Sequence, residues 1–159
     1  MKKKILSLEQ LAAKSGQLKT AGKRVVATNG CFDILHVGHV RYLAAARKLG
    51  ATLVVGLNGD SSVRQLKGEG RPINPEQDRA EVLAALESVD YVTIFPELRA
   101  TNFLRAAQPS IYAKGGDYTA DTLDLSERVV LAKFGTKIEI IPFEQRYSTS
   151  QLLTRIGKA

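Results

Sequence analysis

The chain of 159 residues has a single cysteine, Cys31, and no long uncharged apolar run. One cysteine cannot form an intramolecular disulfide, which is consistent with a reducing compartment, so we expect a cytoplasmic protein. No stretch approaches the ~20 apolar residues that cross a bilayer. The N-terminal Met-Lys-Lys-Lys precedes a segment too polar for a signal peptide. The length and these absences predict one globular domain with no membrane partner.

Acidic residues are also scarce, with 16 Asp and Glu against 23 Lys and Arg, a formal net charge of +7. A basic balance often marks a nucleic-acid-binding protein. Here, however, residues 1–24 hold seven basic residues and one acid, Glu9, whereas residues 25–159 hold 16 basic and 15 acidic residues. We therefore interpret residues 1–22 as a solvated, basic helical segment before a nearly neutral domain (residues 23–159), and expect no nucleic-acid partner.

The N-terminal segment has the pattern of an amphipathic helix. Ser7 is placed to cap it, and Gln10, three residues later, completes a capping box. Gly22 is a suitable residue to end the helix. The expected apolar face consists of Leu8, Leu11, Ala12 and Leu18.

Short apolar runs then alternate with helical patterns. We expect strands at residues 24–29, 52–57, 91–95, 110–114 and 137–141. Helices are expected at residues 38–49, 60–66, 75–87, 101–107, 124–134 and 148–156. This alternation predicts an α/β fold, a three-layer, doubly wound, Rossmann-like domain around a five-stranded parallel sheet. Ligands of such folds bind at the carboxyl ends of the strands, so the loops there are the candidate sites.

The loop after the first strand, residues 30–39 (GCFDILHVGH), holds both histidines of the chain. Gly30 and Gly38 allow close approach of the backbone, and the N-terminus of the following helix offers free N–H groups to an anion. His36 and His39, three residues apart, can face the same way and bind phosphate. Packing roles stay open. Zinc ligation lacks the i, i+4 spacing with an adjacent Glu, and a nucleophilic Cys31 would need a demonstrated base.

Two further loops follow predicted strands. Residues 114–118 (KGGDY) combine flexible glycines with Lys114 and Asp117, although a simple turn explains the pattern as well. Residues 147–150 (YSTS) place Ser148 as a helix cap, and three hydroxyls in succession favour a second phosphate cradle. All three loops should meet at one edge of the sheet.

Several common nucleotide and hydrolase motifs are missing. No G-x-G-x-x-G follows a strand, and G-x-x-x-x-G-K-[ST] and G-x-S-x-G do not occur. The sequence therefore lacks the motifs that would indicate a dinucleotide-fingerprint dehydrogenase, a P-loop NTPase or a serine hydrolase.

The run GCFDILHVGH resembles the G-x-F-D-x-x-H-x-G-H signature of the cytidylyltransferase-like nucleotidyltransferases. The resemblance extends from about Arg24 to Ile156. Within the family the sequence is most similar to the adenylyltransferases of ADP-heptose synthesis, a unit that many bacteria fuse to a sugar kinase. That likeness is carried by LKGEGRPI (66–73), YAKGGDY (112–118) and STSQLL (148–153).

The resemblance implies transfer of AMP from ATP to D-glycero-β-D-manno-heptose 1-phosphate, with release of pyrophosphate, for lipopolysaccharide cores. It also implies Mg²⁺ bound with ATP, no metal held by the protein itself, and a homodimer. Other acceptors of the same fold stay open, such as glycerol 3-phosphate with CTP or a flavin with ATP. A nucleotide-binding module without catalysis is a further alternative.

The resemblance also suggests roles for individual residues. The catalytic set is expected to be His36, His39, Lys67 and Arg71, the last two on a loop that closes on phosphates. Nucleotide contacts are expected from Asn29, Gly30, Cys31, Phe32, Gly38, Lys114, Gly115, Asp117, Ser148, Thr149 and Ser150. Substrate contacts are expected from Asp33, Arg71 and Arg146.

Two of these assignments, and one further residue, need comment. Asp33 is expected to orient its loop or lie near the sugar phosphate. Glycerol-phosphate cytidylyltransferases have an Arg at the position of Phe143 and a Gly at that of Arg146, so the family arginine does not map directly onto Arg146. Arg79 is expected to support the site, the alternative being a surface ion pair with Asp78.

Overall fold

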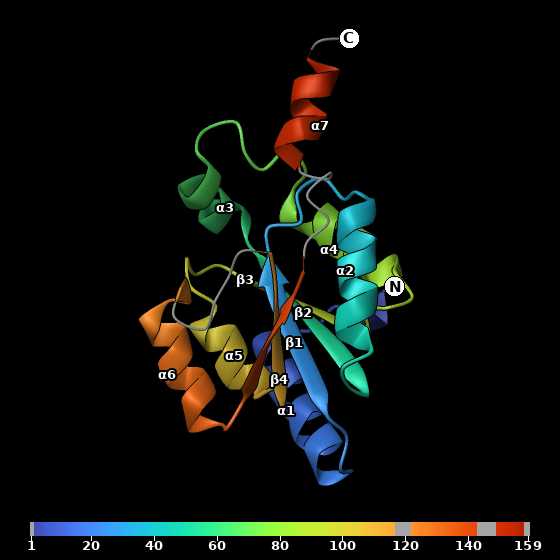
Figure 1. Ribbon diagram of the computed structural model, residues 1–159, viewed down its shortest axis with the longest axis vertical. Coiled ribbons are helices and arrows are strands. Elements are labelled where there is room, and N and C mark those ends of the chain that lie inside the picture. Colours follow the sequence, from blue (N-terminus) through green and yellow to red (C-terminus); the bar gives the residue numbers. More distant parts are fainter. Residues whose placement is uncertain (1, 117–121, 143–148, 158–159) are drawn as a thin grey trace.

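The computed structural model describes residues 2–116, 122–142 and 149–157, in which strands alternate with helices (Figure 1). The strands are β1 (Val25–Gly30), β2 (Thr52–Asn58), β3 (Tyr91–Phe95), β4 (Ile111–Gly115) and β5 (Lys137–Ile141). The α-helices are α1 (Leu8–Thr20), α2 (Val37–Arg47), α3 (Asp60–Lys67), α4 (Glu76–Ala85), α5 (Thr101–Ala107), α6 (Leu125–Lys133) and α7 (Thr149–Ile156). A short 3₁₀ helix, Lys2–Lys4, precedes them.

The five strands form one parallel sheet in the order β3-β2-β1-β4-β5, which confirms the predicted architecture. The central strand β1 lies between β2 and β4, and the direction of winding reverses there. Such a reversal opens a crevice at the carboxyl ends of the two strands between which it occurs. The site is therefore expected above β1 and β4.

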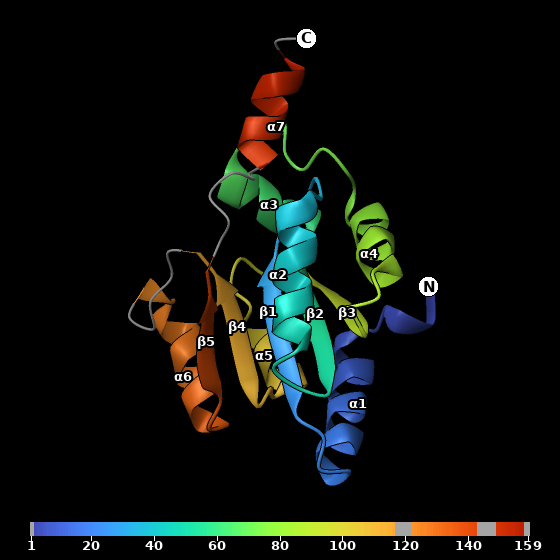
Figure 2. The same ribbon diagram turned by 45° about the vertical axis from the view of Figure 1, so that its right-hand side comes forward.

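Helices cover both faces of the sheet, giving three layers (Figures 1 and 2). Side chains alternate along β1, so Val26 joins the apolar cluster beneath α2 and α4, whereas Val25 and Ala27 join the one beneath α1, α5 and α6. Both clusters consist of fully or nearly fully buried residues. Burial on both faces explains the near-continuous apolar character of the strands.

The N-terminal segment differs from the prediction of a solvated appendage. Ser7 and Gln10 form the predicted capping box of α1, but Leu11 is fully buried and α1 packs against α5. Ile5 makes a parallel bridge with Val92, and the ammonium of Lys4 donates to the carbonyl of Val89 at 2.7 Å. These contacts make the segment part of the fold because its apolar side completes the core.

The predicted apolar face of α1 is wrong at one position. Ala12 is exposed, and Ser15 is buried in its place. Leu8 and Leu18 are partly buried against the same cluster as Leu11. The buried face therefore follows the spacing 8, 11, 15 and 18, which matches the 3.6-residue helical repeat better than 8, 11, 12 and 18.

Element boundaries agree with the predictions to within about two residues. The strand Tyr91–Phe95, the helix Thr101–Ala107 and the strand Lys137–Ile141 are as predicted. β1 and β4 each extend one residue further, because Gly30 pairs with Leu57 and Gly115 with Ile141. α4 ends at Ala85, since Leu86 has extended backbone angles. None of the helices in the described part of the chain has the length and apolarity to cross a membrane.

Candidate functional site

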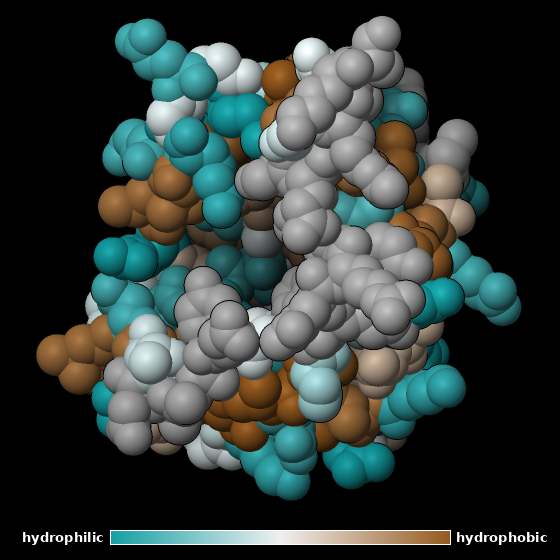
Figure 3. Space-filling model, turned by 45° about the horizontal axis from the view of Figure 1, so that its top comes forward, coloured by the Kyte–Doolittle hydropathy of each residue, from teal (hydrophilic) through white to brown (hydrophobic). Residues whose placement is uncertain are grey.

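A cleft of about 610 Å³ lies at the carboxyl ends of β1 and β4, where the winding of the sheet reverses. Figure 3 looks onto this end of the molecule and shows a hollow with hydrophilic residues inside it. The walls come from the loop after β1, the first turns of α2, the end of α3 and its following loop, the β3–α5 loop, the end of β4, the start of α6, and Thr149. The predicted convergence of the loops in one pocket is confirmed for their described residues.

The two histidines lie together at one end of this cleft. His36 is the N-cap of α2 and His39 lies in its first turn, which stacks their rings at 3.9 Å between centroids and 23° between planes. The backbone N–H of His36 donates to Nδ1 of His39 at 3.4 Å, and the ring of Phe32 meets His39 edge-on at 5.4 Å. The predicted common orientation of the imidazoles is confirmed.

This environment favours the uncharged form of both imidazoles. Burial lowers the pKa of His36. Burial, with repulsion from His36, lowers the pKa of His39 to about 4. Because Nδ1 of His39 accepts a hydrogen bond, the proton of the neutral ring belongs on Nε2. His39 is thus a neutral hydrogen-bond donor at neutral pH, and an anion bound beside it would favour protonation.

Asp33 fixes the loop that follows α3. Its carboxylate pairs with Nε of Arg71 at 2.5 Å and accepts the backbone N–H groups of Ile73 and Asn74 at 2.8 and 3.0 Å. Burial pushes the pKa of Asp33 up, but the hydrogen bonds from Asn74, Ile73 and Arg71 outweigh it, so the pKa is below its ordinary value. Asp33 was expected to orient its own loop, whereas its carboxylate anchors the loop after α3, and this anchoring holds Arg71 at the cleft wall.

Arg79 supports the same region from beneath. It is 2% exposed and donates to the carbonyl oxygens of Cys31, Asn58 and Asn74. Its other partner is the carboxylate of Asp60 at 2.7 Å. The predicted supporting role is confirmed and the alternative of a surface ion pair with Asp78 is wrong, since Asp78 is exposed and Arg79 points inward. One guanidinium therefore ties together the ends of β1, β2 and the loop before α4.

Lys114 and Asn29 meet on the floor of the cleft, at the end of β4 and β1 respectively. The ammonium of Lys114 donates to Oδ1 of Asn29 at 2.7 Å and lies 5.1 Å from the ring centre of Tyr112. The hydroxyl of Tyr112 donates to the same oxygen. Burial lowers the pKa of Lys114, although the carboxylate of Glu127 opposes this effect. A cation held this deep is well placed to meet an anionic ligand.

Most of the predicted site residues that the structure describes line the cleft: Asn29, Gly30, Cys31, Phe32, Asp33, His36, His39, Lys67, Arg71, Lys114, Gly115 and Thr149. Gly38 differs, because it is buried in the first turn of α2 and is not part of the wall. Asp117, Arg146 and Ser148 lie outside the described residues. Ser150 is described only as part of the backbone of α7. Thr149 donates to the carbonyl of Ile34 at 3.4 Å, which joins α7 to the histidine loop.

Cys31 does not have the properties of a nucleophile. Its thiol is partly exposed on the cleft wall. Burial raises the pKa of this thiol, and the positive charges of Lys67, Arg79 and Arg71 oppose the rise only in part. A raised pKa keeps the sulfur protonated at neutral pH. Among the described residues no group of three or more His, Cys, Asp or Glu could hold a metal ion.

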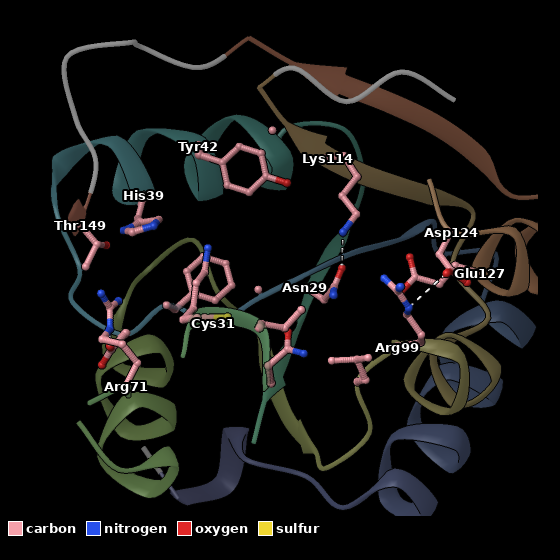
Figure 4. A pocket seen from close by; sticks show the side chains of 18 of the residues that line it. Asn29, Cys31, His39, Tyr42, Arg71, Arg99, Lys114, Asp124, Glu127 and Thr149 are labelled. Carbon is pink, nitrogen blue, oxygen red and sulfur yellow. Dashed lines mark hydrogen bonds and ion pairs between the residues drawn. The ribbon is translucent and has the colours of Figure 1, made fainter. Parts of the chain in front are cut away.

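The sequence interpretation missed one whole side of the cleft. This side is formed by Leu98 and Arg99 after β3 and by residues 122–124 and Glu127 at the start of α6 (Figure 4). Tyr42, Asn58 and Leu66 also line the cleft. The available signal was position: Arg99 follows β3 by a few residues, and the carboxyl ends of parallel strands share one edge.

Comparison with known proteins agrees with this geometry. The model of the cytidylyltransferase-like family matches residues 27–155. The chain is 46% identical over 156 residues to the bifunctional protein HldE of Geobacter sulfurreducens, and 47% identical over 153 residues to that of Pelobacter propionicus. These matches cover 98% and 96% of this chain but 31% of each relative. The chain thus spans about a third of the length of these relatives.

Solved structures are similar as well. The lipopolysaccharide core biosynthesis protein from Thermoplasma volcanium is 30% identical, with a TM-score of 0.64 over 80% of this chain and 100% of that one. The pantoate-β-alanine ligase from Francisella tularensis, in complex with β-γ ATP and β-alanine, has a TM-score of 0.61 over 98% of this chain and 78% of that one. At 14% identity the second match shows a shared fold alone.

Proposed function

Because the chain belongs to the cytidylyltransferase-like family of nucleotidyltransferases, we propose that it transfers AMP from ATP to D-glycero-β-D-manno-heptose 1-phosphate, giving ADP-heptose and pyrophosphate. The HldE relatives and the lipopolysaccharide core biosynthesis protein support this acceptor. The observation that carries the proposal is the stacked pair of His36 and His39 at the N-terminus of α2, at one end of a cleft that also holds cationic side chains.

The chemistry needs alignment and charge neutralisation more than proton transfer. A sugar phosphate has a second pKa near ~6, so at neutral pH its oxygen is already an anionic nucleophile. That oxygen forms a bond to the α-phosphorus of ATP while the bond from this phosphorus to the pyrophosphate oxygen breaks. No general base is required, and the barrier is lowered by holding the two anions in line and neutralising the charge that develops.

The residues at the histidine end can supply that neutralisation. Nε2–H of His39 donates a hydrogen bond to a phosphate oxygen, and the N–H groups at the N-terminus of α2 favour the same anion. Lys67, at the end of α3, and Arg71, on the loop after it and held by Asp33, bring positive charge to the wall. Ser148, Thr149 and Ser150 are assigned to the leaving pyrophosphate as hydroxyl donors, for which Thr149 exchanges its present acceptor, the carbonyl of Ile34, for a phosphate oxygen. These roles assign the histidine end of the cleft to the triphosphate.

Mg²⁺ belongs to this proposal as the companion of ATP. The described residues form no cage of three or more metal ligands, and the carboxylate of Asp33 is engaged by Arg71 and two backbone N–H groups. This fits an ion held chiefly by phosphate oxygens, as Mg²⁺ usually is in nucleotide sites. When bound, the ion neutralises part of the triphosphate charge.

The finer assignments of the partners also belong to the proposal. ATP and the sugar 1-phosphate are the small-molecule partners, and a homodimer is expected from the family resemblance. A cytoplasmic location rests on the single cysteine, Cys31, which needs no oxidising compartment.

The function is tested by pyrophosphate release with a panel of ATP or CTP against heptose 1-phosphate or glycerol 3-phosphate. We expect turnover only with ATP and heptose 1-phosphate, and a loss of roughly 100-fold or more in His36→Ala and in His39→Ala, the scale of one lost transition-state contact. Arg105→Gln is the matched control, because Arg105 is exposed on α5 and should leave turnover unchanged.

The outcomes separate the alternatives. Turnover with CTP and glycerol 3-phosphate, but none with ATP and heptose 1-phosphate, contradicts the acceptor and keeps the fold. ATP binding without release of pyrophosphate from any pair indicates a non-catalytic nucleotide-binding module. Unchanged turnover in either histidine variant removes that imidazole from the mechanism.

A further inference from the structure

The end of the cleft away from the histidines has its own group of charged residues, which the mechanism above does not use. Arg99 lies on the β3–α5 loop, and Asp124 and Glu127 lie at the start of α6. Nε of Arg99 pairs with Oδ2 of Asp124 at 3.1 Å, and Oε1 of Glu127 accepts the backbone N–H of Ala100 at 2.9 Å. Figure 4 shows these side chains beside Asn29 and Lys114, across the cleft from His39 and Arg71.

The two ends of the cleft differ in the chemistry that they favour. Carboxylates accept hydrogen bonds and repel phosphate, so Asp124 and Glu127 make this end unsuitable for a polyphosphate. A hydroxyl group is both donor and acceptor, and can donate to a carboxylate while it accepts from a guanidinium. Leu98 and Leu123 add apolar wall at the same end, which suits the C–H faces of a sugar.

The in-line geometry of phosphoryl transfer determines whether the nucleotide or the acceptor reaches this end of the cleft. In phosphoryl transfer the attacking and leaving oxygens lie on opposite sides of the phosphorus, roughly in line. If pyrophosphate leaves toward His36 and His39, the acceptor attacks from the opposite side. Lys114 lies on the floor between the two ends, where the acceptor phosphate would pass.

We propose that Arg99, Asp124 and Glu127 form the subsite that binds the hydroxyl groups of the acceptor sugar and so select a polyhydroxylated sugar phosphate. The inference rests on the proposed function and deepens it. A hydroxyl that bridges Asp124 and Arg99 satisfies both charges at once, and Glu127 extends the row of acceptors along the wall.

The carboxylates of Asp124 and Glu127 also stabilise the fold, and the test must separate this contribution from substrate binding. Oδ1 of Asp124 caps α6 by accepting the N–H of Ser126 at 2.9 Å, and Oδ2 faces Arg99. Asn is as good an N-cap as Asp, so Asp124→Asn keeps the cap and removes the charge. Glu127→Gln likewise keeps an oxygen for the N–H of Ala100.

The experiment measures KM and kcat for heptose 1-phosphate and, separately, KM for ATP in Asp124→Asn, Glu127→Gln and Arg99→Gln. We expect KM for the acceptor to rise roughly 10-fold to 100-fold in Asp124→Asn and Arg99→Gln, the scale of one hydrogen bond to a charged group. KM for ATP should change less than about threefold, well below one such bond. Glu139→Gln, on the edge strand β5 and outside the cleft, is the control and should change neither constant.

Each outcome bears on one claim. A rise in KM for ATP with an unchanged acceptor KM assigns this end to the nucleoside and overturns the inference, as do unchanged constants in all three variants. A wild-type protein that does not turn over heptose 1-phosphate contradicts the proposed function instead. Thermal melting of each variant accompanies the kinetics, and a variant that melts like the wild type with a raised acceptor KM supports the subsite.

Discussion

At the scale of single residues, the neutral state of His39 links the site to the stability of the fold. Burial, and secondarily repulsion from His36, holds the pKa of His39 at about 4, against 6.5 for the free side chain. The unfolded chain therefore takes up a proton at higher pH than the folded chain does. Stability from this group is fully present above pH 6.5 and is lost as the pH falls toward about 4.

We predict that the free energy of unfolding decreases between these two pH values, and that His39→Gln, which cannot titrate, reduces the decrease. Urea denaturation at pH about 7 and about 5 measures both effects, since the window lies between the two pKa values. Arg105→Gln serves as the control with an intact histidine pair. An equal pH dependence in His39→Gln and the control would show that burial does not hold His39 neutral.

The sequence predicts the residues of the site where their chemistry is local. The spacing of His36 and His39 at a helix start, after a buried strand, suffices to predict that both rings face one ligand. No local sequence pattern identifies Arg99 and Glu127 as site residues, because the packing of α5 against α6 brings them to the cleft. Arg79 was recognisable as a supporting residue only by resemblance, since nothing in the sequence shows that its guanidinium is buried.

At the scale of elements, the contact between β2 and α5 depends on the absence of a side chain at Gly56. A Cβ at this position would lie 2.7 Å from two ring carbons of Phe103, which is fully buried. We predict that Gly56→Ala destabilises the protein by about 1–3 kcal/mol, because a packed ring must shift. Urea denaturation measures the change, and Gly56→Ala with Phe103→Leu should recover part of it if the ring is the cause.

Gly16 provides the opposite case within the same protein. It lies in α1, and no atom stands within 4 Å of a Cβ built on it. Gly16→Ala should therefore stabilise the protein by about 0.5–1 kcal/mol, the difference in helix propensity. A loss of stability in both variants would indicate that backbone effects, rather than the Phe103 ring, dominate at Gly56.

The elements themselves were predicted well because each has a strong periodic or β-branched pattern bounded by turn residues. The errors are at helix ends and on the face of α1. Ser15 is buried although it is polar, and Ala12 is exposed although it is apolar. Which face of a helix is buried depends on its neighbours, and a small side chain such as Ala12 gives little preference. The doubly wound parallel architecture could be predicted because parallel strands with helical crossovers have few right-handed arrangements, whereas the strand order comes from the structure alone.

At the scale of the whole molecule, the net charge of +7 is less informative than its location. Residues 1–24 carry most of the excess, on a segment whose apolar side enters the core through Leu11 and whose Ile5 lies beside Val92 on the sheet edge. The solvent-exposed side of this segment is therefore basic, and its buried side packs in the core. Substitution of the exposed basic residues tests the effect of charge on activity, and deletion of the segment tests the effect of packing on stability.

We predict that deletion of residues 1–22 abolishes cooperative folding or lowers the melting temperature by more than about 10 °C. The deletion exposes the apolar cluster around Phe103 and Leu104, and removal of a fully buried Leu alone costs about 2–5 kcal/mol.

The surface charge of the segment is tested separately. Lys3→Gln, Lys23→Gln and Arg24→Gln combined remove three exposed charges and should leave the melting temperature and kcat/KM for ATP unchanged. Thermal denaturation and pyrophosphate release measure both. A stable, active truncated protein would show that α1 is dispensable, whereas a loss of activity in the triple variant would place the basic surface in the reaction.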